Sequence, residues 1–157
     1  MTSDSIRNAT RLFLNSRIED YSNCIALTLT MKQHSGGFKL DEVRASKNFR
    51  HFMNILNKKT FGKAFQRFGK RISVVPVMEN SENERLHFHA LLQCPDKYSS
   101  TAGQAIFALK AQSLWKKTHF GYDQTSSRLA ADEGWTGYIT KLKGQADQID
   151  WENFHWN

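Results

Sequence analysis

Long apolar runs are missing from the 157-residue sequence, and their absence excludes a membrane-spanning helix. No apolar stretch approaches the roughly 18 residues that such a helix requires. The first residues, Met1 to Asn8, are polar and lack the apolar segment of a secretory signal. We therefore expect a soluble intracellular protein that does not contact a membrane.

Cysteine is also scarce. Cys24 and Cys94 lie far apart and form no Cys-x-x-Cys pair, which argues against a zinc ribbon and against a redox motif. Both lie in apolar segments, so we expect two buried thiols. The chain lacks internal repeats, low-complexity segments and any composition change that would mark a domain boundary. We expect one domain over residues 1–157, with its core at about 23–143 and a tail at 145–157.

Acidic residues are outnumbered by basic ones, 15 to 22, and the formal net charge at pH 7 is +7. Such a balance favours polyanionic partners, nucleic acid above all. Between Asn57 and Arg71 six cations and three phenylalanines occur without any acid. We expect an amphipathic helix there, with Phe61, Phe65 and Phe68 inward and the cations gripping DNA phosphates. These predicted DNA-binding residues are Lys58, Lys59, Lys63, Arg67, Lys70 and Arg71.

Strands are predicted where apolar residues alternate with other types, at 23–31, 71–79 and 85–94. Pro76 interrupts the second segment, and because proline cannot donate to a ladder it predicts an edge position or a bulge. The polar residues between the second and third segments predict a hairpin connection. Residues 118–129 could add a short strand or a loop.

Helical spacing predicts helices at about 6–17, 41–57, 100–117 and 130–143, although Gly134 and Gly137 disfavour the last one. The apolar positions expected to face the core are Val43, Phe49, Phe52, Met53 and Leu56, then Ile106, Leu109, Leu114 and Trp115. Hairpin-connected strands with separate helices indicate an α+β fold with an antiparallel sheet.

The sequence His87-Phe88-His89 is a candidate metal-binding motif. Residues two apart on a strand face the same way, so both imidazoles would project from one face. Two neutral imidazoles can hold a divalent cation, although two structural or surface histidines would give the same pattern. Glu79 ends the preceding strand, and a hairpin would bring its carboxylate to the imidazoles. Glu82 or Glu84 could take this role instead, or Glu79 could be an exposed hairpin residue.

A third motif, Tyr138-Ile139-Thr140-Lys141, places a phenol and an ammonium on one face of a predicted helix. A phenol is a poor nucleophile near neutral pH because its ordinary pKa is about 10, and a nearby cation favours the ionised form. The Tyr-x-x-Lys pattern alone also fits a tyrosine packed at a helix interface beside a solvated lysine.

Together the motifs resemble the HUH endonuclease superfamily, in particular its rolling-circle replication initiators, or Rep proteins. The segment ALTLT at 26–30 is similar to the first family motif, HFHALL at 87–92 to the second, and YITK at 138–141 to the third in its single-tyrosine form. The motifs occur in the family's order, and the resemblance spans roughly residues 23–143.

The resemblance implies a ferredoxin-like antiparallel sheet with helices packed on it. It implies that Glu79, His87 and His89 bind Mg²⁺ or Mn²⁺, which polarises an oxygen of the scissile phosphate. Tyr138 would then be the nucleophile, leaving a 5′-phosphotyrosine and a free 3′-OH that can later reverse the step. Lys141 would neutralise phosphate charge or position a metal-bound water.

The resemblance also implies partners and a location. The expected substrate is single-stranded DNA or an origin hairpin of a plasmid, phage or virus. A helicase, either from the host or fused to a longer chain, is a candidate partner, and the isolated chain is expected to be a monomer. The location would be the cytoplasm of a bacterial host, or the host-cell nucleus for a eukaryotic virus.

Two other functions remain open. A single-tyrosine HUH transposase shares the chemistry but is expected to be an obligate dimer, and the Tyr-x-x-Lys spacing and threonine-rich first motif favour a Rep protein. A non-catalytic module binding single-stranded DNA or RNA would need stacking aromatics, which the face of His87 and His89 does not offer. A histidine-triad hydrolase is disfavoured because Leu91 occupies the place of its third histidine.

Overall fold

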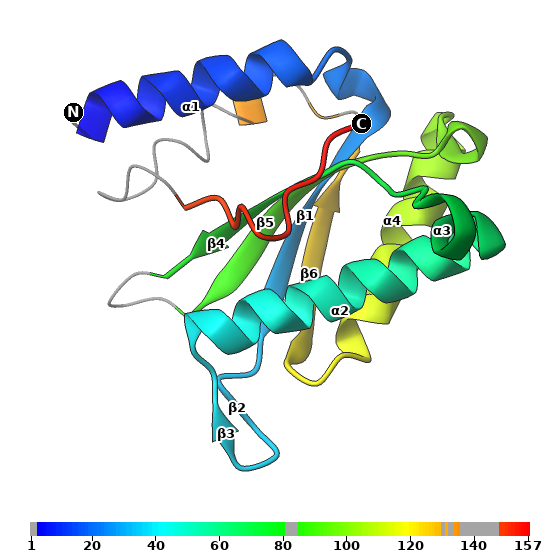
Figure 1. Cartoon of the computed structure of the whole chain (residues 1–157). Coiled ribbons are helices and arrows are strands. Elements are labelled where there is room, and N and C mark those ends of the chain that lie inside the picture. The colour runs from blue at the N-terminus through cyan, green and yellow to red at the C-terminus, as the bar shows by residue number, and fades with distance from the viewer. Residues whose placement is uncertain (1–2, 81–84, 130, 132–133, 136–147) are drawn as a thin grey trace.

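A computed structural model describes residues 3–80, 85–129, 131, 134–135 and 148–157 (Figure 1). Four strands form one antiparallel sheet in the order β4-β5-β1-β6, which confirms the predicted α+β class. The strands are β1 (Cys24–Met31), β4 (Val74–Glu79), β5 (His87–Gln93) and β6 (Gly121–Arg128). A separate small hairpin pairs β2 (His34–Ser35) with β3 (Phe38–Lys39).

The helices connect and cover this sheet. They are α1 (Ser3–Arg17), α2 (Glu42–Phe61), α3 (Lys63–Phe68) and α4 (Thr101–Lys116), with short 3-10 turns at Tyr21–Asn23 and Asp96–Tyr98. The order β1-α2-β4-β5-α4-β6 inserts β5 between β1 and β4, which is the ferredoxin-like arrangement that the resemblance implied. None of the described helices is both long enough and apolar enough to cross a bilayer.

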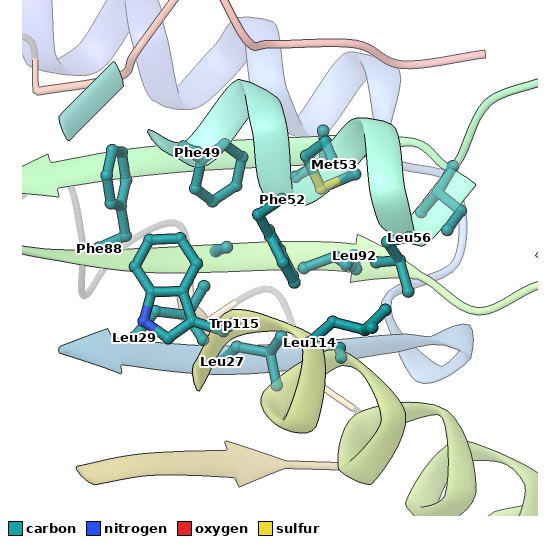
Figure 2. Close-up of a cluster of buried hydrophobic side chains, with 14 of the residues drawn as sticks. Leu27, Leu29, Phe49, Phe52, Met53, Leu56, Phe88, Leu92, Leu114 and Trp115 are labelled. Atoms are coloured by element: carbon teal, nitrogen blue, oxygen red, sulfur yellow. The ribbon is translucent and has the colours of Figure 1, made fainter. Parts of the chain in front are cut away.

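One face of the sheet packs against α2 and α4 and forms the larger core (Figure 2). The alternating residues Leu27 and Leu29 of β1 point into it beside Phe88 of β5, as period-two patterning requires. The rings of Phe49, Phe88 and Trp115 meet there, with the centroids of Phe49 and Phe88 4.7 Å apart. This core fixes the direction in which every neighbouring strand residue points.

The other face is covered by α1 and the C-terminal segment 148–157. Leu14 and Ile18 of α1 pack with Val77, Leu91 and Trp156. The predicted packing of the tail aromatics onto the body is confirmed, since the ring of Phe154 contacts those of Phe13 and Trp151.

The C-terminal segment also pairs with β4, which is an edge strand of the sheet. Val74 donates its N–H to His155 and accepts one in return, and Asp150 donates to the carbonyl of Pro76. Pro76 thus lies on an edge strand, as its missing N–H predicted.

Three apolar residues predicted to face the core are instead exposed: Val43 in the first turn of α2, and Ile106 and Leu109 on α4. On α4 the buried stripe runs through Phe107, Ala111 and Leu114. This helix is apolar on two faces, so periodicity alone selected the wrong one.

The predicted helix over the basic stretch is broken in two. Gly62 has a φ of 56°, a left-handed value that glycine adopts without steric cost, and it separates α2 from α3. The six predicted DNA-binding cations are all exposed. Phe61 and Phe65 are half-buried, but Phe68 is 82% exposed, so the prediction that all three phenylalanines point inward is wrong. The break turns α3 away from the axis of α2, and Phe68 leaves the core with it.

Candidate metal centre

The hairpin of β4 and β5 brings Glu79, His87 and His89 together. Glu79 lies directly opposite His87 in the strand register, and Val77 lies opposite His89. Phe88 enters the larger core, so the two flanking imidazoles project from the opposite face, as the alternation predicted. The grouping of the three predicted metal ligands is therefore confirmed, and these three residues are called the triad below.

The ligand atoms of the triad converge on one point. Nε2 of His87 lies 2.8 Å from Oε2 of Glu79, and Nε2 of His89 lies 2.9 Å from the same oxygen. The two Nε2 atoms are 3.2 Å apart. The carboxylate is buried, while the imidazoles keep 16% and 12% of their surface exposed. A ligand can therefore approach from the imidazole side.

Hydrogen bonds on the far side of each ring orient the imidazoles. Nδ1 of His87 lies 2.7 Å from the carbonyl oxygen of Arg85, which can only accept, so this nitrogen carries the proton and a neutral ring leaves Nε2 bare. Nδ1 of His89 lies 3.3 Å from the hydroxyl of Thr28. Both contacts favour the tautomer that presents Nε2 to a metal ion.

A bare Nε2 facing a carboxylate oxygen at 2.8 Å sets two acceptors against each other, an arrangement that a cation between them neutralises. At metal–ligand distances of about 2.1 Å, adjacent ligands of an octahedral ion lie about 3.0 Å apart, against about 3.4 Å for a tetrahedral ion. The three observed separations of 2.8, 2.9 and 3.2 Å match one face of an octahedron. The residues present thus fit an octahedral divalent cation with its remaining positions open to water or phosphate oxygens.

Polar residues of β1 and β6 extend the same face beyond the triad. Thr28 and Thr30 lie opposite His89 and His87 in register, and Ser126 of β6 lies opposite Thr28. The hydroxyl of Thr30 donates to the carbonyl of Gln124. The apolar half of this face is the part that α1 and the C-terminal segment cover, so the triad occupies the polar half.

The predicted nucleophile Tyr138 and its neighbour Lys141 lie outside the described residues, as do Glu82 and Glu84. The described residues on either side of the segment 136–147 can be placed. Trp135 packs against the smaller apolar cluster, which includes Val77 and Leu91 of the triad's face. Gln148 accepts a hydrogen bond of 2.8 Å from the N–H of Met78, the residue before Glu79.

Sequence reasoning did not identify Thr28 or the carbonyl of Arg85 as partners of the imidazoles. A signal for Thr28 existed, because it lies in the 26–30 segment already singled out as a motif. Its role depends on the pairing of β1 with β5, which local spacing does not reveal.

Comparison with protein families gives a match to the replication-associated protein family of the ORF2 type, over residues 24–143. The chain belongs to this family. The matched region begins at the first residue of β1, contains the whole sheet with the triad, and extends through Tyr138 and Lys141. No curated protein and no solved structure matches the chain.

Membership of the replication-associated ORF2 family agrees with a rolling-circle Rep nuclease domain, the type of protein that the motifs resemble. It links the chain to DNA replication and gives the basic composition a partner, DNA.

Proposed function

We propose that this member of the replication-associated ORF2 family is a single-tyrosine HUH endonuclease that nicks and rejoins single-stranded DNA to initiate rolling-circle replication. The observation that carries the proposal is the convergence of Glu79, His87 and His89 within hydrogen-bond distance of one another on the polar half of the sheet. Two imidazoles and one carboxylate with open positions suit a catalytic cation rather than a closed structural one.

Mg²⁺ or Mn²⁺ bound by the triad supplies Lewis-acid polarisation of a non-bridging oxygen of the scissile phosphate. Glu79 contributes the negative charge that neutralises part of the cation. The imidazoles hold their Nε2 atoms in place through the carbonyl of Arg85 and the hydroxyl of Thr28. The octahedral spacing of these atoms leaves the opposite side for a phosphate oxygen and water.

Tyr138 is the proposed nucleophile. Its phenolic oxygen attacks the phosphorus and gives up its proton, and the 3′ oxygen of the preceding nucleotide leaves and takes up a proton. One phosphodiester replaces another, so a later 3′-OH can attack the phosphotyrosine and rejoin the strand without an energy source. We assign Lys141, three residues further on, to neutralising the phosphate charge.

The positions of the other tyrosines support this assignment. Among the described residues, Tyr21 precedes β1 and Tyr98 follows β5, so both lie at the end of the sheet away from the triad. Tyr122 follows Gly121, which pairs with Met31 at the triad's end, and is the alternative nucleophile. The contacts of Trp135 and Gln148, one on the triad's face and one beside Glu79, favour Tyr138 over Tyr122.

The test uses a pool of labelled single-stranded oligonucleotides with Mn²⁺. The wild-type protein should form a protein–DNA adduct that survives denaturant and disappears with EDTA. Tyr138→Phe should abolish the adduct, whereas the matched variant Tyr122→Phe should retain it. An adduct in Tyr138→Phe that is lost in Tyr122→Phe would move the nucleophile to β6. DNA binding without any adduct would favour a non-catalytic binding module.

A single-tyrosine HUH transposase shares this chemistry. The family description, which refers to replication, favours an initiator. Solution mass separates the two, because the transposase is expected to be an obligate dimer and the initiator domain a monomer.

A further inference from the structure

The basic stretch of residues 57–71 lies at the opposite end of the sheet from the triad. The C-terminal half of α2 and α3 extend past the end where β5 finishes, whereas the triad lies where β5 begins (Figure 1). His87 and Gln93 mark the two ends of β5, about 20 Å apart at the roughly 3.4 Å rise per residue of an antiparallel strand. The cations at this end therefore do not contact the scissile phosphate.

A hollow of about 650 Å³ opens at this end, a volume in the range of ligand-binding sites. Its wall includes Gln93, Thr60 and Asn157, and three cations line it: Lys70, Arg71 and Lys97. Asp96 is the one acid in the described lining, so the wall carries a positive balance. This balance favours an anionic ligand.

Aromatic rings beneath the three cations help to hold them in place. The ammonium of Lys70 lies 5.1 Å from the ring centre of Phe61, and the guanidinium of Arg71 lies 5.5 Å from that of Phe65. The ammonium of Lys97 lies 5.3 Å from the ring centre of Tyr98 and donates to the carbonyl of Thr60. Cations held in this way lose less conformational freedom on binding than unsupported surface lysines.

The rings under the cations are not open stacking surfaces, because Phe61 and Phe65 are half-buried and covered by charged groups. The hollow is therefore suited to contact phosphates rather than to read bases. A strand that also reaches the triad must span about 20 Å, which is about six nucleotides at the 3.4 Å stacking rise.

We propose that the hollow lined by Lys70, Arg71 and Lys97 is a distal anchor for the phosphate backbone of the same single strand that the triad engages. The anchor rests on the proposed function for the other end of that strand. It makes productive binding depend on DNA length, because only a strand longer than about six nucleotides reaches both places.

The experiment measures the affinity of the full chain, in EDTA, for oligo-dT strands of increasing length and at several salt concentrations. The variant removes the three cations: Lys70→Ala, Arg71→Ala and Lys97→Ala together. The matched control removes three exposed cations outside the hollow: Lys47→Ala, Lys116→Ala and Lys117→Ala. The Mn²⁺ affinity of each variant, measured without DNA, checks that the triad is intact.

The wild type and the control should show a rise in affinity of about tenfold or more as the strand lengthens beyond about six to ten nucleotides. The anchor variant should lose this rise while keeping its affinity for short strands, and its salt slope on long strands should fall by about 2. Unchanged binding of long strands, or equal weakening at every length, overturns the distal anchor. Failure of the adduct assay with this length dependence intact would instead overturn the nuclease and leave a DNA-binding protein.

Discussion

The hydroxyl oxygen of Thr28 lies 3.3 Å from Nδ1 of His89, and the two residues are directly opposite each other in the pairing of β1 with β5. This contact ties a residue of the first motif to a metal ligand of the second. It gives Thr28 a positioning role that does not require contact with the metal or with DNA.

Thr28→Val keeps the shape of the side chain and removes the hydroxyl, so the ring of His89 loses its partner at Nδ1. We expect the Mn²⁺ affinity to fall by about tenfold, the usual loss when an outer partner of a metal-bound histidine is removed. Thr28→Ser should restore most of the affinity because it keeps the hydroxyl. Electron paramagnetic resonance of free Mn²⁺ measures both variants, and equal affinity in Thr28→Val and wild type would show that the hydroxyl does not orient the ring.

Glu79→Gln removes the anionic ligand and keeps the volume. The Mn²⁺ affinity should fall by more than the roughly hundredfold that outer-sphere changes produce, because a ligand and its charge are both lost. The metal-free melting temperature should not fall, since the new amide can donate to the bare Nε2 of His87. Glu152→Gln, an exposed residue on the C-terminal segment, is the matched control and should bind Mn²⁺ as the wild type does. Retained affinity in Glu79→Gln would remove Glu79 from the ligand set.

Metal binding should stabilise the fold, because the triad joins β4 to β5 only in the folded chain. At a Mn²⁺ concentration a hundred times its dissociation constant, the stabilisation is about 2.7 kcal/mol. Calorimetry or fluorescence melting should show a rise of several degrees that EDTA reverses. The double variant His87→Ala with His89→Ala should show no such rise, and a full rise in that variant would place the bound ion elsewhere.

The two cysteines should be chemically silent in the folded protein. Burial raises the pKa of the Cys24 thiol to about 12, with smaller contributions from Cys94 and Asp20, and burial raises the pKa of Cys94 to about 12 as well. The reactive thiolate is therefore almost absent below about pH 11. Ellman's reagent at pH 8 should label neither thiol in the native state and both after unfolding. Rapid labelling of the native protein would contradict the buried placement.

The triad could be predicted from sequence because its determinants are local. Alternation along one strand puts His87 and His89 on the same face, and a short hairpin brings Glu79 opposite them. The role of Thr28 could not be predicted in this way, because Thr28 and His89 are joined only by the long-range pairing of β1 with β5.

The location of the basic stretch was also beyond local reasoning. Composition identified the cations correctly as exposed, but their distance from the triad depends on the direction of α2 across the sheet and on the break at Gly62. The inner face of α4 was misjudged at Ile106 and Leu109 for a similar reason, since the choice between two apolar faces is made by the packing of Phe107 and Trp115 against the sheet.

Mass spectrometry of the trapped adduct tests the central claim most directly. After reaction with single-stranded DNA and Mn²⁺, nuclease trimming and tryptic digestion, the account predicts a nucleotide-modified peptide of residues 129–141, with the mass added at Tyr138. This peptide should be absent when EDTA is present or when His87 and His89 are replaced by alanine. A modified peptide of residues 118–128, which contains Tyr122, or a metal-independent adduct would contradict the account.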